Sequence, residues 1–247
     1  MKVVYDPNEE SLGPDGFDFC PGCGYGSVVM CLIEALQRSQ ELDPLFLLDI
    51  GCVDFMVGHL PGDTMIGTHG RTPALAAGYK FVAPDRLVVA IQGDGGFMAV
   101  GAGESLHSAL RGDPITIVVL NNGVLADTGG QYSPSTPPSV STTTSPPGRE
   151  RKPLPFLEML ATLDGVAFAQ RVAIDSVLGV RRVTRALARA IEVQRSGEGL
   201  GIVEILSPCP THWRLDPVES WAMIRSEMVN HYPVGIIKPA SEGDEDE

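Results

Sequence analysis

Short apolar runs rich in β-branched residues recur along the chain, each bounded by polar or glycine-rich segments. They cover residues 45–50, 87–92, 115–120 and 202–206, with a weaker run at 166–169. Because successive positions within a run are apolar, both faces of each strand are predicted to be buried. This is typical of a parallel sheet between two layers of helices.

Segments with helical periodicity alternate with these strands, at 25–39, 73–82, 98–110, 175–195 and 217–230. Asp175 and Asp216 stand at expected N-cap positions, and Pro217 at a first helical position. The alternation predicts one α/β domain over residues 1–238, a single doubly wound, mainly parallel sheet with flanking helices. In such a fold, ligands bind at the carboxyl ends of the strands.

Composition narrows the classes of function. The 247 residues are 43% hydrophobic and 20% charged, as in a globular domain with its own core. Because 18 Lys and Arg face 31 Asp and Glu, the net charge of −13 argues against nucleic acid or a membrane as partner. No transmembrane helix is expected. Residues 1–7 lack the pattern of a secretory signal, so we expect a cytoplasmic protein.

Two segments have biased compositions. Residues 133–147 are Ser, Thr or Pro at every position except Val140. A loop of this length in a compact domain often covers a ligand, so 128–150 is predicted to be an active-site loop. Residues 239–247 carry five carboxylates and are predicted to form a disordered acidic tail.

Glycine-rich turns follow two of the predicted strands. The first reads Gly93-Asp94-Gly95-Gly96, and the second Asn121-Asn122-Gly123. Glycine lets backbone approach a phosphate, and the helix predicted after the first turn points N–H groups at an anion. Asp94 and Asn122 offer the oxygen ligands that Mg²⁺ prefers. The alternative is two ordinary turns of an α/β protein, but their occurrence on adjacent-looking strands favours a phosphate and magnesium site.

Four cysteines are predicted to meet at the same edge of the sheet. Cys20 and Cys23 form a Cys-x-x-Cys pair, whereas Cys52 and Cys209 each follow a predicted strand. Four thiolates bind zinc or a [4Fe–4S] cluster. Two ligands that are isolated in the sequence favour the cluster without excluding zinc. Cys31 lies inside an apolar helix and is expected to be a core residue.

Together, these motifs resemble the β subunit of 2-oxoacid:ferredoxin oxidoreductases, over residues 20–238. The glycine and asparagine turns are similar to the thiamine diphosphate motif of thiamine-dependent enzymes. The segments that carry the resemblance occur in the order Cys20-Pro21-Gly22-Cys23-Gly24, Gly51-Cys52, Thr68-His69-Gly70-Arg71, Gly93-Asp94-Gly95 with Asn122, Thr128-Gly129-Gly130-Gln131-Tyr132-Ser133-Pro134 and Ser207-Pro208-Cys209-Pro210-Thr211.

The resemblance implies a thiamine diphosphate-binding fold of the diphosphate-binding type. It implies that Asp94, the Asn122 side chain and the Val124 carbonyl hold Mg²⁺, and that Cys20, Cys23, Cys52 and Cys209 bind one [4Fe–4S] cluster. The residues expected to contact the cofactors are Gly51, Cys52, Thr68, His69, Gly93, Asp94, Gly95, Gly96, Asn122, Val124, Thr128, Gly129 and Gln131.

The implied reaction is thiamine-dependent oxidative decarboxylation of a 2-oxoacid to acyl-CoA and CO₂, with electrons passing through the cluster to ferredoxin. 2-Oxoglutarate is favoured, and branched-chain 2-oxoacids and pyruvate stay open. By the same resemblance, an α subunit supplies the glutamate that engages the pyrimidine ring, so this chain alone is expected to be inactive. Gamma and ferredoxin-like delta subunits are further expected partners.

His69 and Arg71 are the candidate catalytic residues. Histidine exchanges protons near neutral pH, and arginine grips a carboxylate or phosphate. A structural histidine that caps the next helix is an equally good explanation of His69. The chain departs from the family at Gly96, where a second acid is usual, and at Leu125-Ala126-Asp127, where Tyr-Gly-Met is common.

Two other classes of function remain open. A non-redox thiamine-dependent decarboxylase or synthase needs the magnesium site but no cluster. A zinc-stabilised interaction protein needs the cysteines but not the glycine turns.

Overall fold

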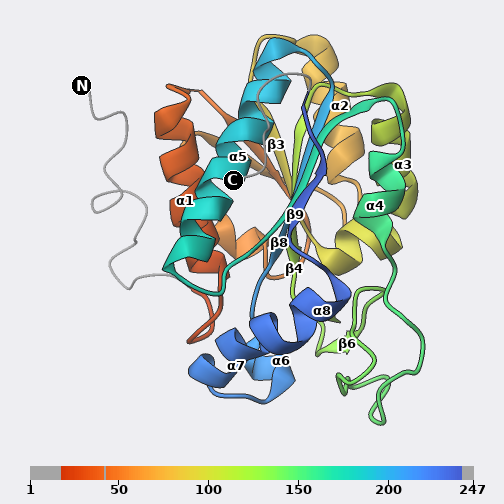
Figure 1. Cartoon of the computed structure of the whole chain (residues 1–247). Coiled ribbons are helices and arrows are strands. Elements are labelled where there is room, and N and C mark those ends of the chain that lie inside the picture. Colours follow the sequence, from red (N-terminus) through yellow and green to blue (C-terminus); the bar gives the residue numbers. More distant parts are fainter. Residues whose placement is uncertain (1–17, 42, 241–247) are drawn as a thin grey trace.

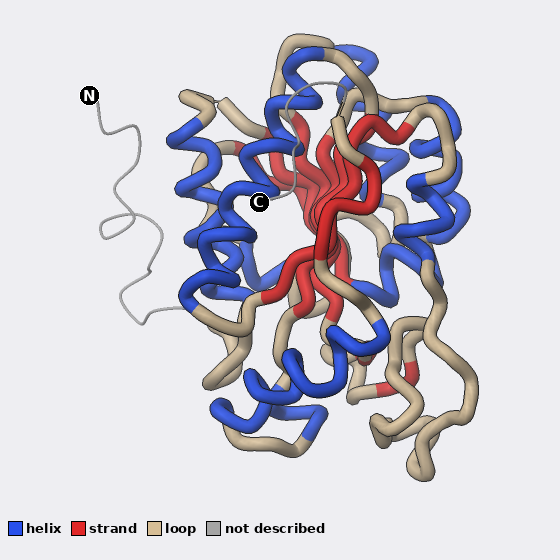
Figure 2. The backbone as a smooth tube through the Cα atoms, viewed as in Figure 1, coloured by secondary structure: helices blue, strands red, loops and turns tan. Residues whose placement is uncertain are grey.

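The computed structural model describes residues 18–41 and 43–240. The expectations for residues 1–7 and for 241–247 of the acidic tail lie outside the described residues. Within the described part, seven strands form one sheet in the order β2-β1-β3-β4-β8-β7-β9, with helices on both faces (Figures 1 and 2). Neighbouring strands are parallel except β9, which pairs antiparallel with β7. The predicted fold class is confirmed.

The strands of the sheet are β1 (Leu45–Leu48), β2 (Asp63–Ile66), β3 (Val88–Gly93), β4 (Thr116–Asn121), β7 (Val166–Ala173), β8 (Leu200–Leu206) and β9 (Gly235–Lys238). A small hairpin consists of β5 (Val124–Leu125) and β6 (Gln131–Tyr132). The helices are α1 (Tyr25–Arg38), α2 (Thr72–Val82), α3 (Ala102–Arg111), α4 (Phe156–Ala161), α5 (Val177–Ser196), α6 (Pro210–Trp213), α7 (Pro217–Met223) and α8 (Val229–His231).

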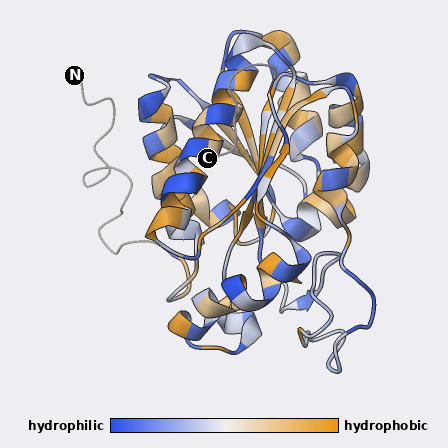
Figure 3. Ribbon diagram, viewed as in Figure 1, coloured by the Kyte–Doolittle hydropathy of each residue, from blue (hydrophilic) through white to orange (hydrophobic). Residues whose placement is uncertain are grey.

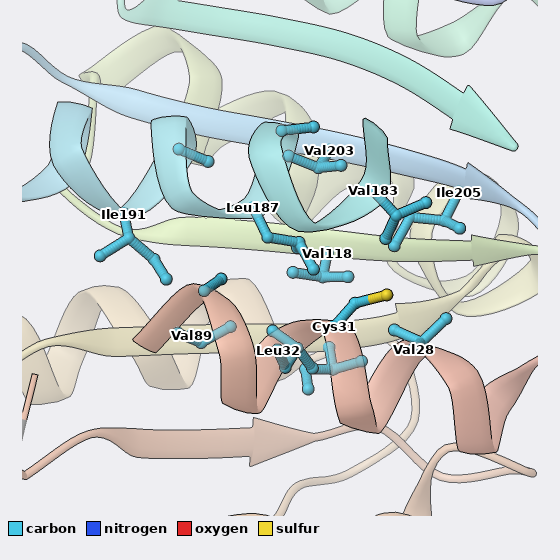
Figure 4. Packing of buried hydrophobic residues seen from close by; sticks show 14 of the residues in the cluster. Val28, Cys31, Leu32, Val89, Val118, Val183, Leu187, Ile191, Val203 and Ile205 are labelled. Atoms are coloured by element: carbon cyan, nitrogen blue, oxygen red, sulfur yellow. The ribbon is translucent and has the colours of Figure 1, made fainter. Parts of the chain in front are cut away.

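Alternate residues of the central strands supply two cores. Val89, Val118 and Val203 pack with α1 and α5 on one face, in the cluster shown in Figure 4. Their neighbours in sequence, such as Val88, pack with α2, α3 and α4 on the other face. The central strands are accordingly mostly hydrophobic in Figure 3. Cys31 is buried in the first core, as predicted.

All five predicted strands are present, but β2, β9 and α4 were not predicted. The edge strand β2 is largely exposed and lacks the apolar run of a central strand. Of the predicted N-caps, Asp216 is confirmed by a full capping box, with Pro217 in the first turn. The expectation for Asp175 is wrong: Ser176 caps α5, because its hydroxyl accepts the Gly179 N–H.

Two predicted helices are interrupted. The segment 98–110 divides into a π-helical turn, Gly96–Val100, and α3, with Gly101 between them. A Cβ at Gly101 would lie 2.3 Å from the Gly70 carbonyl oxygen, so this break lets the two loops pack together. The segment 217–230 similarly divides at a π-helical turn, Ile224–Met228. No helix of the described residues has the length and apolarity needed to cross a bilayer.

Candidate active site

The carboxyl ends of β1, β3, β4 and β8 lie side by side and bring the predicted turns together. They lie at the end of the sheet where α6, α7, α8 and the β5–β6 hairpin are found (Figure 1). A cleft opens at this edge. Its lining residues are Tyr25, Ile50, Gly51, Cys52, Val53, His69, Gly93, Asp94, Gly95, Gly96, Asn122, Val124, Leu125, Ala126, Asp127 and Thr128.

Asp94 follows β3 and is almost fully buried in the wall of this cleft. Burial raises the pKa of its carboxyl group to about 6, against the smaller opposing effect of hydrogen bonds from Ser133 and Ser135. An isolated buried carboxylate is costly, and a divalent cation would offset that cost. The position suits a metal ligand better than a structural acid.

Asn122 presents its side chain from the end of β4, the strand next to β3. Its Oδ1 accepts the Val124 N–H at 3.1 Å, and its Nδ2 donates to the Tyr25 hydroxyl at 3.2 Å. Its backbone carbonyl accepts the indole N–H of Trp213. The amide orientation is therefore defined from several sides, as a metal-binding side chain requires.

A network of buried polar side chains supports the turn that carries Asn122. Asn121 donates to Glu204 at 2.6 Å, and Glu204 accepts from Arg171 at 2.7 Å. Arg171, only 1% exposed, also forms a two-pronged ion pair with Glu158. Asn121 Oδ1 in turn accepts the Gly123 N–H. The network anchors the turn that carries Asn122 to β7 and α4.

The Ser/Thr/Pro segment folds against the two turns. Ser133, Ser135 and Thr136 are buried although they belong to a polar run. The Ser135 hydroxyl donates to Asp94 Oδ2, and the Thr136 hydroxyl donates to the Gly123 carbonyl at 2.6 Å. The segment therefore packs against the turns that line the cleft, although none of these three residues is itself in the lining. Sequence composition gave no means to select these residues from the run.

The cysteines gather from three parts of the chain. None of the five is in a disulfide. The thiol groups of Cys23 and Cys52 each interact electrostatically with both Cys20 and Cys209, and Cys209 also interacts with Asp94. Among the described residues, however, no three His, Cys, Asp or Glu side chains are already arranged around a single metal ion.

Glycines in the Cys-Pro-Gly-Cys-Gly turn explain this meeting. A Cβ on Gly24 would lie 2.4 Å from Ser207 Oγ, so glycine is needed for the turn to reach the loop that carries Cys209. Gly22 has φ +81°, and a Cβ there would meet Pro217 at 2.6 Å. The turn is further held by the Trp221 indole N–H, which donates to the Gly22 carbonyl.

Burial controls the acidity of three of these thiols. It raises the pKa of Cys23 and Cys52 to about 12 and that of Cys209 to about 11. A nucleophilic thiol needs a pKa near or below neutrality, so Cys23, Cys52 and Cys209 are not suited to act as nucleophiles. A metal or cluster would displace these protons on binding.

The loop between β2 and α2 places its two candidate catalytic residues differently. His69 lines the cleft, and its Nδ1 lies 3.1 Å from Asp49 Oδ2. Arg71 lies outside the cleft lining and is paired with Glu104 of α3. Thr68 is exposed and accepts the Arg71 N–H through its carbonyl.

The loop after β5 contributes Thr128 to the cleft. Its hydroxyl donates to the side chain of Gln131, and Gln131 Nε2 donates back to the Thr128 carbonyl, both at 2.6 Å. Gly129 between them has φ +118°, a conformation that favours glycine. Gln131 itself is not among the lining residues.

Two residues that line the cleft or support it were not singled out by the sequence analysis. Asp49 directly follows β1 and is fully buried beside His69. Its place at a strand end was a usable signal. Tyr25 directly follows the cysteine motif, but nothing in the sequence indicated that its hydroxyl would reach Asn122.

The residues present fit the implied cofactors. Asp94 and Asn122 form an oxygen donor set suited to Mg²⁺. A Cβ at Gly95 or Gly96 would clash with Leu125 or Asp49, so glycine keeps the diphosphate turn close to its neighbours. On the sulfur side, Ser207 Oγ is buried beside Gly24 without a hydrogen-bond partner among the described residues.

Comparisons with known proteins agree with this geometry. Residues 49–205 match the family described as "Thiamine pyrophosphate enzyme, C-terminal TPP binding domain". The 2-oxoglutarate synthase subunit KorB of Archaeoglobus fulgidus is 34% identical over 81% of this chain and 73% of its own. The ketoisovalerate oxidoreductase subunit VorA of Methanothermobacter thermautotrophicus is 33% identical over 90% of this chain, which spans about half of that relative (47%).

A solved structure shares the fold. The 2-oxoglutarate:ferredoxin oxidoreductase from Magnetococcus marinus, with 2-oxoglutarate, coenzyme A and succinyl-CoA bound, superposes with a TM-score of 0.79 at 24% identity. The match covers 98% of this chain and 87% of that one. With the thiamine-binding domain matched and the KorB and VorA relatives aligned along most of its length, this chain belongs to the β subunits of the 2-oxoacid:ferredoxin oxidoreductases.

Proposed function

We propose that the chain carries the diphosphate end of thiamine diphosphate and a [4Fe–4S] cluster in an enzyme that converts a 2-oxoacid to acyl-CoA and CO₂ and reduces ferredoxin. The observation that supports this most is the meeting of two donor sets at one sheet edge. Asp94 and Asn122 offer oxygen ligands, and the cysteine thiols lie beside them.

Each donor set has a distinct role. Asp94, Asn122 and the Val124 carbonyl would hold Mg²⁺, and Gly93, Gly95 and Gly96 would admit the diphosphate. Cys20, Cys23, Cys52 and Cys209 would hold the cluster. When bound, thiamine diphosphate supplies an electron sink for decarboxylation, and the cluster accepts the electrons singly.

The remaining residues act on the substrate side of the cleft. His69 lines the cleft and would exchange a proton there, while Asp49 holds its Nδ1. Ile50 and Leu125 contribute apolar side chains to the cleft lining and would help to exclude water once the cofactor is bound. Thr128, Gly129 and Gln131 would support the cofactor through the loop after β5. Arg71 would grip an anion only in competition with Glu104.

Partner subunits would complete the site. An α subunit would supply the glutamate for the pyrimidine ring, and gamma and ferredoxin-like delta subunits would be further partners. The chain spans about half of the VorA relatives, and the described residues form one seven-stranded sheet with flanking helices and the small β5–β6 hairpin.

2-Oxoglutarate is the proposed substrate, because the KorB relatives are 2-oxoglutarate synthase subunits. One feature favours ketoisovalerate as a second candidate. The cleft lining includes the apolar residues Ile50, Val53, Leu125 and Ala126, and its described residues include no Lys or Arg. A cation for the second carboxylate of 2-oxoglutarate would then come from a partner subunit.

The test is anaerobic purification of the complex, followed by iron and sulfide analysis and by CoA-dependent ferredoxin reduction. We expect iron and sulfide in the ratio of a [4Fe–4S] cluster, and a higher kcat/KM with 2-oxoglutarate than with ketoisovalerate or pyruvate. The reverse order would identify a branched-chain enzyme. Zinc without iron would overturn the redox function, and activity without iron would indicate a non-redox thiamine enzyme.

A further inference from the structure

A buried carboxylate lies directly behind His69. Asp49 follows β1, and its side chain is 0% exposed. Its Oδ1 accepts the Gly70 N–H at 2.7 Å, and its Oδ2 lies 3.1 Å from His69 Nδ1. One carboxylate thus contacts both the backbone and the side chain of the loop that carries His69.

Position 96 competes for the same space. A Cβ built on Gly96 would lie 1.8 Å from Asp49 Oδ2 and 3.5 Å from His69 Cε1. A side chain at 96 and the carboxylate of Asp49 are therefore mutually exclusive. The absence of a side chain at Gly96 leaves room for Asp49 to approach the imidazole.

The Gly70 N–H determines which atom of residue 49 faces the imidazole. Because a backbone donor needs an acceptor, it holds Oδ1 and leaves Oδ2 for His69. A carboxylate oxygen only accepts, so His69 must carry its proton on Nδ1. The second nitrogen, Nε2, is then an acceptor, and His69 lines the cleft next to Gly96.

We propose that Asp49 is the positioning residue for His69 and that Gly96 is glycine to admit it. Asp49 fixes the Nδ1–H tautomer, so that Nε2 is the atom that accepts or returns a proton in the cleft. The inference rests on the proposed function for its catalytic meaning. The tautomer itself can be measured without any cofactor or substrate.

The decisive variant is Asp49→Asn. The Gly70 N–H would hold the amide oxygen, so the amide N–H₂ would face His69 and make Nδ1 an acceptor. The ring proton would move to Nε2. In ¹⁵N-histidine NMR of the full chain, with the His69 signals assigned by His69→Gln, we expect Nδ1–H in the wild type and Nε2–H in Asp49→Asn. The same tautomer in both proteins would overturn the proposal.

Kinetics of the complete complex supply the second measurement. Loss of a correctly placed proton-transfer group costs about 10²-fold or more in kcat. We expect such a loss in Asp49→Asn, with KM, iron and bound thiamine close to wild type. The double variant Asp49→Asn/His69→Gln should be no slower than His69→Gln, because Asp49 acts only through His69. Additive losses would contradict this role.

Exchanging the residues at positions 49 and 96 tests the proposal even if the single variants fold poorly. Gly96→Asp alone should be impaired, since two carboxylates would overlap. Asp49→Gly/Gly96→Asp should recover the Nδ1–H tautomer and most of kcat; a double variant no better than either single one would count against the proposal.

Asp43→Asn, at the exposed other end of β1, is the matched control and should behave as wild type. A wild type without thiamine-dependent activity would refute the proposed function and leave the tautomer result intact.

Discussion

The side-chain amide of Asn122 donates to the hydroxyl of Tyr25 at 3.2 Å, linking the turn after β4 to the first residue of α1. Tyr25 is 2% exposed, and its hydroxyl interacts electrostatically with Cys23, Cys52, Cys209 and Asp94. One phenol therefore lies between the proposed cluster ligands and the proposed magnesium ligands. By accepting from Nδ2, it fixes the amide orientation in which Oδ1 accepts the Val124 N–H.

Tyr25→Phe removes this hydroxyl and keeps the ring. Because one hydrogen bond that orients a metal ligand is lost, we expect Mg²⁺-dependent thiamine diphosphate binding to weaken about tenfold or more. Isothermal titration with the cofactor measures this, with iron content unchanged. The control is Tyr79→Phe on α2, which removes a hydroxyl that accepts a hydrogen bond from Arg86. Equal affinity in the two variants would show that Asn122 needs no support from Tyr25.

Asp94→Asn should abolish thiamine binding yet stabilise the cofactor-free chain. The folded pKa of about 6 exceeds the ordinary 3.8, so folding favours the protonated acid. Below pH 3.8 the carboxyl is protonated in both the folded and the unfolded chain, and its burial does not lower the free energy of unfolding. This loss of stability grows as the pH rises from 3.8 to about 6 and is complete above pH 6. Above pH 6 we expect the amide to gain about 1–3 kcal/mol in free energy of unfolding by urea titration. A variant less stable than wild type there would contradict the burial penalty.

Gly24→Ala should separate the two loops that carry Cys23 and Cys209. The φ of −76° suits any residue, so the effect is purely the approach of Cβ to Ser207. We expect reduced iron content after anaerobic reconstitution and a loss of about 1–3 kcal/mol in stability. Gly78→Ala, with no atom near the added methyl group, should instead gain about 0.5–1 kcal/mol. Full iron occupancy in Gly24→Ala would rule out this close packing as a requirement.

Arg171→Met should destabilise the fold by about 3–5 kcal/mol, because it leaves Glu204 buried without its cation. Chemical denaturation measures this. Through Glu204 and Asn121, the loss should also weaken thiamine diphosphate binding. Arg111→Met breaks an exposed pair with Asp113 and should cost no more than about 1 kcal/mol. Similar losses in both variants would mean that the buried network adds no stability.

The sequence by itself determined the layered α/β fold and placed the candidate ligands at the ends of its strands. Continuous apolar runs specify buried parallel strands, and parallel strands end at one edge, so Asp94, Asn122, Cys52 and Cys209 were expected together there. These are consequences of local pattern and chain direction. The helix interruption at Gly101 was not visible, because it depends on close packing against the Gly70 loop. The π-helical turn within 217–230 was also not predicted.

Only the tertiary structure decided which polar groups support those candidate ligands. Asp49 and Gly96 are distant in sequence, and their competition for one space appears only when β1 and β3 lie side by side. The same holds for Tyr25 with Asn122 and for Ser135 with Asp94, whose contacts span long stretches of chain. Hydrophobic periodicity reports burial along one element, whereas a hydrogen bond between two elements depends on how they pack.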